Sequence, residues 1–461
     1  MRLALKDKQV LVLGLGDTGL SALRWLGQQR ARLAVADTRE APPHLALLQS
    51  EMPGVNVHLG AFNSQAFTTA EIIVASPGVA VAGPLAETQV LAAIRRGIPV
   101  VGDVELFAQH KSPDAKVIAI TGANGKSTVT MLVGEMCKAA GLKTMVAGNI
   151  GPPVLETLAM QTPDVYVLEL SSFQLEITSS LAADAATVLN VTEDHMDRYS
   201  GMAKYAAAKA RIFAGTGVQV LNRQDGWSSG MALPGRKQLS FGSDLPPGHN
   251  DFGLKHQGSN VWLMQGSTEL IKTSEMHIAG LHNACNALAA LALCRAIGLD
   301  YAPLLSALCN YKGLPHRVEW VSEISGVAFY DDSKGTNVGA TCAALSGLSQ
   351  KVVLIAGGDG KGQDFTPLRE AVLQNARAVV LIGRDGPQIA AVLKDTGIPL
   401  LNAASLEQAV TTAFGAAHPG DAVLLSPACA SFDMFRNYLH RAEVFVSAVK
   451  ALQQSPKAAA R

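Results

Sequence analysis

The chain alternates short apolar runs with longer stretches whose apolar residues recur at helical spacing. Short runs rich in Val, Ile and Ala, bounded by Gly and polar residues, predict buried strands of parallel sheets. The runs are Val10–Leu13, Arg32–Ala36, Ile72–Ala75, Ile98–Val101, Val117–Ile120, Thr144–Ala147, Val165–Leu168, Ala186–Leu189, Val327–Tyr330, Lys351–Ala356, Ala378–Ile382 and Ala422–Leu425. Their alternation with helical stretches predicts three consecutive α/β units, at residues 1–103, 104–313 and 314–461.

Three other segments complete the predicted elements. Met202–Phe213 has a helical pattern, and the Gly- and Pro-containing residues 218–275 predict a β excursion. His277–Gly298 predicts a long helix. Its apolar part, Ala287–Ile297, is too short for a membrane span and carries Arg295, so we expect a buried helix.

One glycine loop has the pattern of a phosphate-binding site. The residues Val117 to Thr128 read VIAITGANGKST, a strand followed by a glycine loop and the start of a helix. Such a loop suits phosphate, with Lys126 reaching the β- and γ-phosphates and a hydroxyl of Ser127 or Thr128 holding Mg²⁺. The full pattern has Gly where this chain has Ile120, so the loop is a shortened form that opens at Gly122. An ordinary strand-to-helix turn is the alternative.

A second glycine loop lies in the first unit. Gly14-Leu-Gly16-Asp-Thr-Gly19 follows a strand, and Asp37 ends the next strand about 20 positions on. Taken alone, this pattern indicates an NAD-binding Rossmann unit. The glycines indicate only a tight turn that a pyrophosphate could approach closely. Any nucleotide diphosphate could therefore bind at this turn. Alternatively, the turn binds no ligand.

Polar residues follow each predicted strand of the middle unit. In a parallel sheet these positions share the carboxyl edge where ligands bind, so Lys126, Asn149, Glu169, Asp194 and His195 are expected to converge. Glu169 suits a metal ligand, or alternatively a charge at a helix N-terminus. His195 lies in the acidic run T-E-D-H-M-D. It could be a metal ligand, an acid–base group or a structural histidine.

The third unit repeats this arrangement. Its strand ends carry Asp331-Asp-Ser-Lys334, Gly357-Gly-Asp-Gly-Lys361, Gly383-Arg384 and Ser426-Pro-Ala-Cys-Ala-Ser431. The sequence has no G-x-S-x-G nucleophile elbow, and Cys429 has no flanking acid–base pattern. Phosphoryl transfer from ATP–Mg²⁺ is therefore the expected chemistry. These residues do not identify the molecule that accepts the phosphoryl group.

Composition narrows the class of protein. The 461 residues are 48% hydrophobic, with Lys plus Arg and Asp plus Glu both at 38, so there is no basic field for nucleic acid. The cysteines are scattered in apolar runs and predict reduced core residues. The N-terminus, MRLALKDKQVLVLGLG, is too interrupted by charge for a signal peptide. We expect a cytoplasmic monomer that binds neither membranes nor nucleic acid.

Several motifs together resemble the Mur ligases of peptidoglycan synthesis. They are Gly122-Ala-Asn-Gly-Lys-Ser-Thr128, Gly148-Asn-Ile-Gly151, Leu168-Glu-Leu-Ser-Ser-Phe-Gln-Leu-Glu176, Asn190-Val-Thr-Glu-Asp-His-Met-Asp-Arg-Tyr199, His282-Asn283, Gly313-Leu-Pro-His-Arg317 and Asp331-Asp-Ser-Lys-Gly-Thr-Asn337. The resemblance extends from Gly14 to about Tyr438. Ala123 and Gly335 depart from the usual Thr and Ala, and we expect little effect from either.

The resemblance implies a fold and a reaction. The fold is a Rossmann-like N-terminal domain, a central P-loop ATPase-like domain and a C-terminal Rossmann-like domain. The first glycine turn, Asp332-Ser-Lys334 and Ser426–Asp433 are most similar to members that add D-glutamate to UDP-N-acetylmuramoyl-L-alanine. In that reaction ATP phosphorylates the terminal carboxylate, and the amine of D-glutamate attacks the acyl phosphate. Shielding the acyl phosphate from water suggests closure of the third unit over the second.

The resemblance also implies a role for individual residues. The catalytic group is Lys126, Glu169, His195 and Lys209. The ATP site is Gly122, Ala123, Asn124, Gly125, Lys126, Ser127, Thr128, Asn283, Asn286, Arg317 and Asp332. The UDP-substrate site is Asp17, Thr18, Thr38, Arg39, Ser76, Gly78 and Asn149, so the first glycine turn is expected to bind UDP and not NAD. The D-glutamate site is Lys334, Thr336, Lys361, Ser431 and Phe432.

Two Mg²⁺ sites are implied as well. Ser127 and Glu169 would hold one ion, and Glu169, His195 and a carbamylated Lys209 would hold the other. Without the resemblance Lys209 is only a lysine on a solvated helix face. Carbamylation turns its cation into an anionic oxygen donor.

Three alternative functions remain at this level. A sister amide ligase would add another amino acid, or add glutamate to folate. An NAD-dependent oxidoreductase would use Gly14–Gly19 and Asp37, although it leaves Lys126 without a role. A nucleotide-gated binding protein would bind ATP at the loop without turning it over. The presence of Lys126, Glu169 and His195 argues against this alternative.

Overall fold

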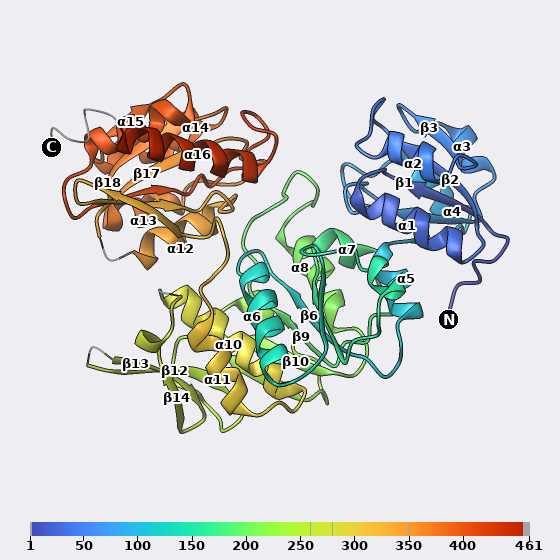
Figure 1. The fold of residues 1–461 in the computed structure, drawn as a ribbon, viewed down its shortest axis with the longest axis horizontal. Coiled ribbons are helices and arrows are strands. Elements are labelled where there is room, and N and C mark those ends of the chain that lie inside the picture. The colour runs from blue at the N-terminus through green and yellow to red at the C-terminus, as the bar shows by residue number, and fades with distance from the viewer. Residues whose placement is uncertain (1, 259, 279, 349, 455–461) are drawn as a thin grey trace. The chain divides into compact units, whose positions relative to one another are not determined.

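The computed structural model describes residues 2–258, 260–278, 280–348 and 350–454 (Figure 1). These residues form two compact units. One holds the residues up to 191 together with 197–275 and 285–310, and the other holds 192–196, 276–284 and the residues from 311 onward. The first unit contains two sheets and the second contains one. The three sheets confirm the predicted series of three α/β units, whereas the boundaries at 103/104 and 313/314 stay predictions.

The first sheet is parallel throughout and has the strand order β3-β2-β1-β4-β5. Its apolar core includes Leu11 and Leu13 of β1 and Ile73 of β4, packed with Phe67 and Val90. The elements are β1 (Gln9–Leu13), α1 (Asp17–Gln28), β2 (Arg32–Asp37), α2 (Leu45–Glu51), β3 (Asn56–Leu59), α3 (Ser64–Thr68), β4 (Ile72–Ala75), α4 (Thr88–Arg95) and β5 (Val100–Val101).

The second sheet has the order β14-β13-β12-β11-β10-β9-β6-β8-β7. Its parallel part pairs β6 with both β8 and β9, so the loop after β6 lies between the ends of these two strands. The elements are α5 (Asp103–His110), β6 (Lys116–Thr121), α6 (Lys126–Ala139), β7 (Thr144–Gly148), η1 (Glu156–Ala159), β8 (Val165–Glu169), α7 (Ser172–Glu176), β9 (Ala185–Val188), α8 (Met202–Ala210), η2 (Arg211–Phe213), β10 (Val218–Asn222), α9 (Gly226–Ser229) and β11 (Gln238–Phe241).

The predicted β excursion is partly a continuation of this sheet. Strands β10, β11 and β12 (Phe252–Gln257) add to it in parallel, and β13 (Asn260–Gln265) and β14 (Thr268–Lys272) then follow with antiparallel pairing. The elements η3 (Thr273–Glu275), α10 (Leu281–Ala296) and α11 (Tyr301–Asn310) follow. The long helix begins later than the predicted His277 because Gly280, at φ +93°, interrupts the helical backbone just before Leu281.

The third sheet has the order β15-β16-β20-β17-β18-β19, with β15 antiparallel to its neighbour and the other pairs parallel. Helices cover both faces, since α15 and α16 pack on one and α12, α13 and α14 on the other. The elements are β15 (Glu319–Ile324), β16 (Val327–Asp331), α12 (Val338–Gly347), β17 (Val352–Gly357), α13 (Leu368–Asn375), β18 (Ala376–Ile382), α14 (Gly386–Leu393), η4 (Lys394–Thr396), β19 (Leu400–Asn402), α15 (Leu406–Ala416), β20 (Ala422–Leu425) and α16 (Tyr438–Gln453).

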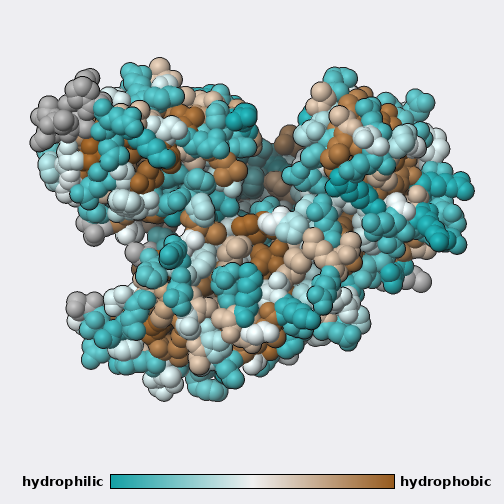
Figure 2. Space-filling view, viewed as in Figure 1, coloured by the Kyte–Doolittle hydropathy of each residue, from teal (hydrophilic) through white to brown (hydrophobic). Residues whose placement is uncertain are grey.

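Hydrophilic side chains cover most of the face shown in Figure 2, with hydrophobic ones exposed in small patches between them. Within the described ranges, no helix has the length and apolar character that crossing a membrane requires. The six cysteines are free thiols, as the sequence predicted, but only Cys137, Cys294 and Cys429 are buried in the core, and the other three are partly exposed.

Candidate functional site

The loop after β6 is shaped by Asn190 and by a left-handed glycine. The N–H of Asn124 donates to Asn190 Oδ1 at 2.7 Å, and the N–H of Ala123 donates to the Asn190 carbonyl at 2.9 Å. These two N–H groups therefore do not point into the loop, contrary to the simple expectation for a phosphate cradle. Gly125 has φ +81°, and a Cβ there would lie 2.6 Å from Asn286 Oδ1. Only glycine fits this position, and it brings Asn286 against the loop.

Lys126 begins helix α6 and folds back over the loop. Its Nζ donates to the carbonyls of Gly122 at 2.8 Å and Ala123 at 2.9 Å. Ser127 and Thr128 are buried in the first turn of the same helix. A cation and two hydroxyls thus lie at a helix N-terminus, which is the arrangement that favours an anionic phosphate.

Glu169 ends strand β8 beside this loop, because it pairs in register with Ile120. Its side chain is 1% exposed. Asn149 Nδ2 donates to Oε1 at 2.7 Å, while Oε2 is buried without a hydrogen-bond partner among the described residues. A buried carboxylate oxygen with no donor is costly unless a ligand satisfies it. The donor set fits Mg²⁺, which prefers carboxylate and hydroxyl oxygens.

Lys209 is not on a solvated helix face. It is 1% exposed, its Nζ donates to the Gly122 carbonyl at 2.8 Å, and it lies 4.5 Å from the Tyr205 ring centroid. The helix α8 therefore brings Lys209 to the same loop as Lys126. Carbamylation would leave one N–H on Nζ to donate to Gly122, so the contact fits both forms of the side chain.

Asp194 and His195 lie in the segment 192–196, which groups with the second unit. His195 has φ +58°, and its Nε2 lies 3.6 Å from Asp194 Oδ2. Asp194 Oδ1 accepts a hydrogen bond from Lys361 Nζ at 2.5 Å. The structure thus joins Asp194 to a lysine expected in the D-glutamate site.

The first glycine turn differs from an NAD-binding turn in the contacts of its acidic residue, Asp37. Both oxygens of Asp37 accept hydrogen bonds, from the Leu15 N–H at 2.7 Å and from the Arg39 guanidinium at 2.8 and 2.6 Å. Burial disfavours the ionised form, but these hydrogen bonds outweigh burial and hold the pKa of Asp37 below its usual value. The carboxylate that would bind a ribose in an NAD site is therefore already occupied.

Five more residues expected around UDP follow strands of the first sheet or begin its first helix, namely Asp17, Thr18, Thr38, Ser76 and Gly78, whereas Asn149 follows β7 of the second sheet. Ser76 Oγ donates to the Gly14 carbonyl at 3.3 Å, and Asp17 Oδ1 lies 2.6 Å from His44 Nε2. Thr38 and Gly78 are exposed, and Thr18 is half-buried at the start of α1.

Asp332 is the most perturbed acid at the third sheet. It is buried, Ser426 Oγ donates to its Oδ2 at 2.6 Å, and burial raises its pKa to about 7. Arg317 is close enough to lower that pKa in part, and its buried Nε has no partner among the described residues. A Cβ on Gly335 would lie 2.3 Å from Asp332 Oδ2. Glycine at this position therefore gives the Asp332–Ser426 pair its room, which makes the departure from Ala more than mild.

The residues expected around D-glutamate occupy loops at the same edge. Lys334 and Thr336 are half-buried, Ser431 is buried, and Lys361 has φ +52°. Phe432 is 73% exposed. The aromatic ring beside Lys334 belongs to Tyr438, whose centroid lies 5.4 Å from the Lys334 Nζ.

Arg441 lies beneath these loops. It is 1% exposed, and it donates to the carbonyls of Ser333 at 2.8 Å and Cys429 at 3.1 Å. Burial lowers its pKa to about 10, so it remains a cation at neutral pH. It ties together the two loops that carry Lys334 and Ser431.

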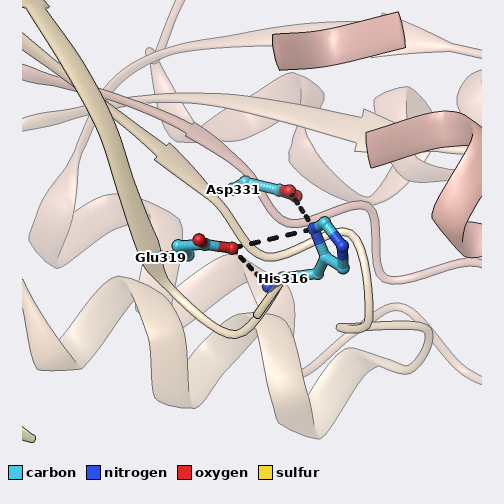
Figure 3. Close-up of side chains that lie close together, drawn as sticks. All are labelled: His316, Glu319 and Asp331. Carbon is cyan, nitrogen blue, oxygen red and sulfur yellow. Dashed lines mark hydrogen bonds and ion pairs between the residues drawn. The ribbon is translucent and has the colours of Figure 1, made fainter. Parts of the chain in front are cut away.

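Three side chains near these sites had no role assigned from the sequence: Asn190, His316 and Tyr438. His316, Glu319 and Asp331 form a cluster whose potential ligand atoms lie within 4.8 Å of one another (Figure 3). His316 was part of the quoted Gly313–Arg317 motif, but a lone histidine in a loop gives no signal of a carboxylate partner 15 positions away. Asn283 lies in segment 276–284 and Asn286 in the first unit, so α10 passes from one unit to the other.

The fold and the loop define a nucleotide-binding enzyme built from three α/β domains. Comparison with protein families finds the Mur ligase MurD-like N-terminal domain at residues 8–102, the Mur ligase middle domain at 120–294 and the Mur ligase glutamate ligase domain at 316–429. The chain belongs to the Mur ligase family, whose members use ATP. This confirms the resemblance that the motifs gave.

Close relatives match over nearly the whole chain. A UDP-N-acetylmuramoylalanine–D-glutamate ligase of Methylobacillus flagellatus is 65% identical, covering 98% of this chain and 99% of the relative. The corresponding protein of Thiobacillus denitrificans is 57% identical, with 98% of each chain covered. Among solved structures, a UDP-N-acetylmuramate-alanine ligase of Thermotoga maritima has a TM-score of 0.60 at 20% identity, covering 96% of this chain and 99% of that one. The solved structure supports the fold alone.

Proposed function

We propose that this protein joins D-glutamate to UDP-N-acetylmuramoyl-L-alanine with ATP, a step of peptidoglycan precursor synthesis. The observation that carries the proposal is its full-length likeness to relatives that bear the name of this ligase. The side chains around the loop after β6 support the phosphoryl-transfer half. The cationic loops of the third sheet support the amino-acid half.

The first step transfers the γ-phosphoryl group of ATP to the terminal carboxylate, giving an acyl phosphate and ADP. Lys126 neutralises negative charge on the transferred group. Its ammonium now donates to two loop carbonyls, so nucleotide binding redirects it toward the phosphates. Asn283, Asn286, Arg317 and Asp332 hold the nucleoside, together with the loop residues 122–128.

Ser127 and Glu169 would hold one Mg²⁺ ion for this step, and Glu169, His195 and carbamylated Lys209 would hold a second. When bound, Mg²⁺ shields phosphate charge and orients the oxygens for in-line transfer. The orphaned Glu169 Oε2 supports this assignment. Asn149 fixes the other oxygen and so holds the carboxylate in one orientation.

In the second step the amine of D-glutamate attacks the acyl carbon. The C–N bond forms, the bond from carbon to the phosphoryl oxygen breaks, and inorganic phosphate leaves. Two lysines, Lys334 and Lys361, pair with the two carboxylates of D-glutamate. Thr336, Ser431 and Phe432 complete its site. Asp17, Thr18, Thr38, Arg39, Ser76, Gly78 and Asn149 hold the UDP-sugar. Monomeric state and cytoplasmic location stay predictions.

The test is phosphate release from ATP–Mg²⁺ and UDP-N-acetylmuramoyl-L-alanine with D-glutamate, L-glutamate or no amino acid. We expect release only with D-glutamate. Release with L-glutamate alone would instead favour a sister amide ligase. NADH binding without UDP-sugar binding would favour an oxidoreductase, which the occupied Asp37 carboxylate already disfavours.

A further inference from the structure

The second step needs a proton acceptor. An α-amino group is largely protonated near neutral pH, and an ammonium has no lone pair with which to attack carbon. The incoming amine must therefore lose one proton to become a nucleophile. None of the five residues expected around D-glutamate is a histidine or a carboxylate.

His316 is held rigidly by two carboxylates. Its Nδ1 lies 2.7 Å from Asp331 Oδ2, and its backbone N–H donates to Glu319 Oε2 at 2.7 Å (Figure 3). Asp331 is fully buried, and its other oxygen accepts the N–H of Ser333 at 2.8 Å. His316 has φ +61°, a backbone conformation that these contacts maintain.

These contacts define which ring nitrogen can accept a proton. An ionised carboxylate only accepts hydrogen bonds, so the bond to Asp331 places the proton of neutral imidazole on Nδ1. Nε2 then carries the lone pair. Figure 3 shows Nε2 on the side of the ring away from both carboxylates, and the side chain is 24% exposed.

The ring lies beside the expected D-glutamate site, in the same compact unit. The His316 and Tyr438 ring centroids are 6.5 Å apart, and Lys334 Nζ lies 5.4 Å from the same Tyr438 ring. The Lys334 N–H also donates to the His316 carbonyl at 3.2 Å. Charged or titratable groups near His316 thus include Glu319, Asp331, Lys334 and Tyr438, and Arg317 follows it in the chain.

We propose that His316 Nε2 is the base that takes the proton from the ammonium of the amino-acid substrate, with Asp331 and Glu319 as its positioning residues. The proposal rests on the proposed function. One N–H bond of the ammonium breaks, its proton goes to Nε2, and its electron pair stays on nitrogen, which then forms the C–N bond. As the bond from carbon to the phosphoryl oxygen breaks, the second proton of the nitrogen leaves with the departing phosphate, and the imidazolium gives the first proton to solvent. A cation held by the same cluster would have to displace the Nδ1 proton from its bond to Asp331, so proton transfer fits the observed contacts better.

The test variant is His316→Asn. Asparagine tolerates a positive φ, and its amide can donate to Asp331 in place of Nδ1, but it has no basic nitrogen. The matched control is His418→Asn, since His418 is an exposed histidine of the same unit whose backbone N–H donates to Asp421. Each variant is assayed with D-glutamate and with hydroxylamine, which is largely uncharged near neutral pH and intercepts an acyl phosphate without needing a base.

We expect His316→Asn to lower kcat with D-glutamate about 100-fold or more, the usual contribution of a general base. Its KM for D-glutamate and its hydroxylamine-dependent phosphate release stay within about threefold of the parent protein. Asp331→Asn also lowers kcat and changes the shape of the pH profile, because an asparagine amide can donate to Nδ1 and so leave the imidazole proton on Nε2. His418→Asn changes neither reaction.

Two results would overturn the proposal. One is full D-glutamate turnover by His316→Asn, and the other is equal loss with D-glutamate and hydroxylamine, which would place His316 in nucleotide binding or folding. Failure of the unchanged protein with both nucleophiles would instead refute the proposed function. The two failures are therefore distinguishable.

Discussion

Two strand–glycine–helix turns of the first unit share a backbone plan and differ in the charges around it. After β1, Gly14 has φ +87°, and after β6, Gly125 has φ +81°. At the first turn an anion, Asp37, accepts the loop N–H of Leu15. At the second turn two lysines, Lys126 and Lys209, donate to the Gly122 carbonyl.

This contrast shows that the glycines determine the backbone shape of the turn, whereas the surrounding side chains determine which ligand it can bind. Glycines permit the left-handed backbone and the close approach of helix to strand. At the first turn Asp37 already satisfies the N–H of Leu15, so that donor is not available to a ligand. The second turn brings the cation of Lys126 and the buried Lys209 to one loop, next to Glu169 with its orphaned oxygen.

The largest expected effect comes from removing the cation of the second turn. Lys126→Ala should lower phosphate release about 1,000-fold, because charge on the transferred phosphoryl group loses its partner. Binding of the UDP-substrate, measured by calorimetry, should not change. Lys138→Ala, on the exposed end of the same helix, is the control and should be silent. Unchanged turnover in Lys126→Ala would remove the loop from the mechanism.

Lys209→Ala sharpens the same contrast, because it tests whether this buried lysine acts as an anion. We expect about a 100-fold loss of turnover, partly rescued by formate or acetate, whose oxygens replace those of the carbamate. Lys204→Ala, on the exposed face of α8, should keep full activity and show no response to added carboxylates. An active Lys209→Ala protein would refute the carbamate role.

A smaller effect is expected at the first turn. Arg39→Ala should raise the KM for the UDP-substrate about tenfold with kcat unchanged, because Arg39 contributes to binding but not to chemistry. The control is Arg24→Ala on α1, which breaks an exposed ion pair with Glu51 at the end of α2. A fall in kcat would contradict the division of labour between the two turns.

The smallest effect concerns pH. Because hydrogen bonds hold the pKa of Asp37 below its unfolded value, its stabilisation is present above that unfolded value and is lost as pH falls through the lowered folded value. Exchange of the Leu15 amide with solvent should therefore accelerate at acidic pH. In Asp37→Asn it should be about threefold to tenfold faster near neutral pH and less dependent on pH. Identical pH profiles would show that Asp37 does not stabilise the turn.

Most strands could be predicted because their signal is local. Runs such as Ile72–Ala75 and Ala422–Leu425 are apolar throughout and appear at those bounds. Strands β3, β15 and β19 were missed. Asn56–Leu59 and Glu319–Ile324 are edge strands with polar positions, and Leu400–Asn402 is a short edge strand. Their pairing comes from the sheet and not from their own composition.

Site prediction depended on the type of residue. Lys126 and Glu169 follow buried strands, so their place at a sheet edge could be inferred. Burial of Lys209 could not, because α8 has only a modest apolar face and its packing decides which lysine is enclosed. Phe432 and Tyr438 both follow Ser431, and the path of the backbone into α16 determines which ring lies beside Lys334.

The grouping of segment 192–196 with the second unit has a consequence for synthesis on the ribosome. The first sheet is complete once its last strand, β5, has emerged, whereas the Asp194–Lys361 ion pair joins residues 167 positions apart. At about 5–20 residues per second, Lys361 follows Asp194 by roughly 10 to 30 s. During that interval the nascent chain carries its nucleotide loop without the partner of Asp194, so the second unit is the last part of the protein to mature.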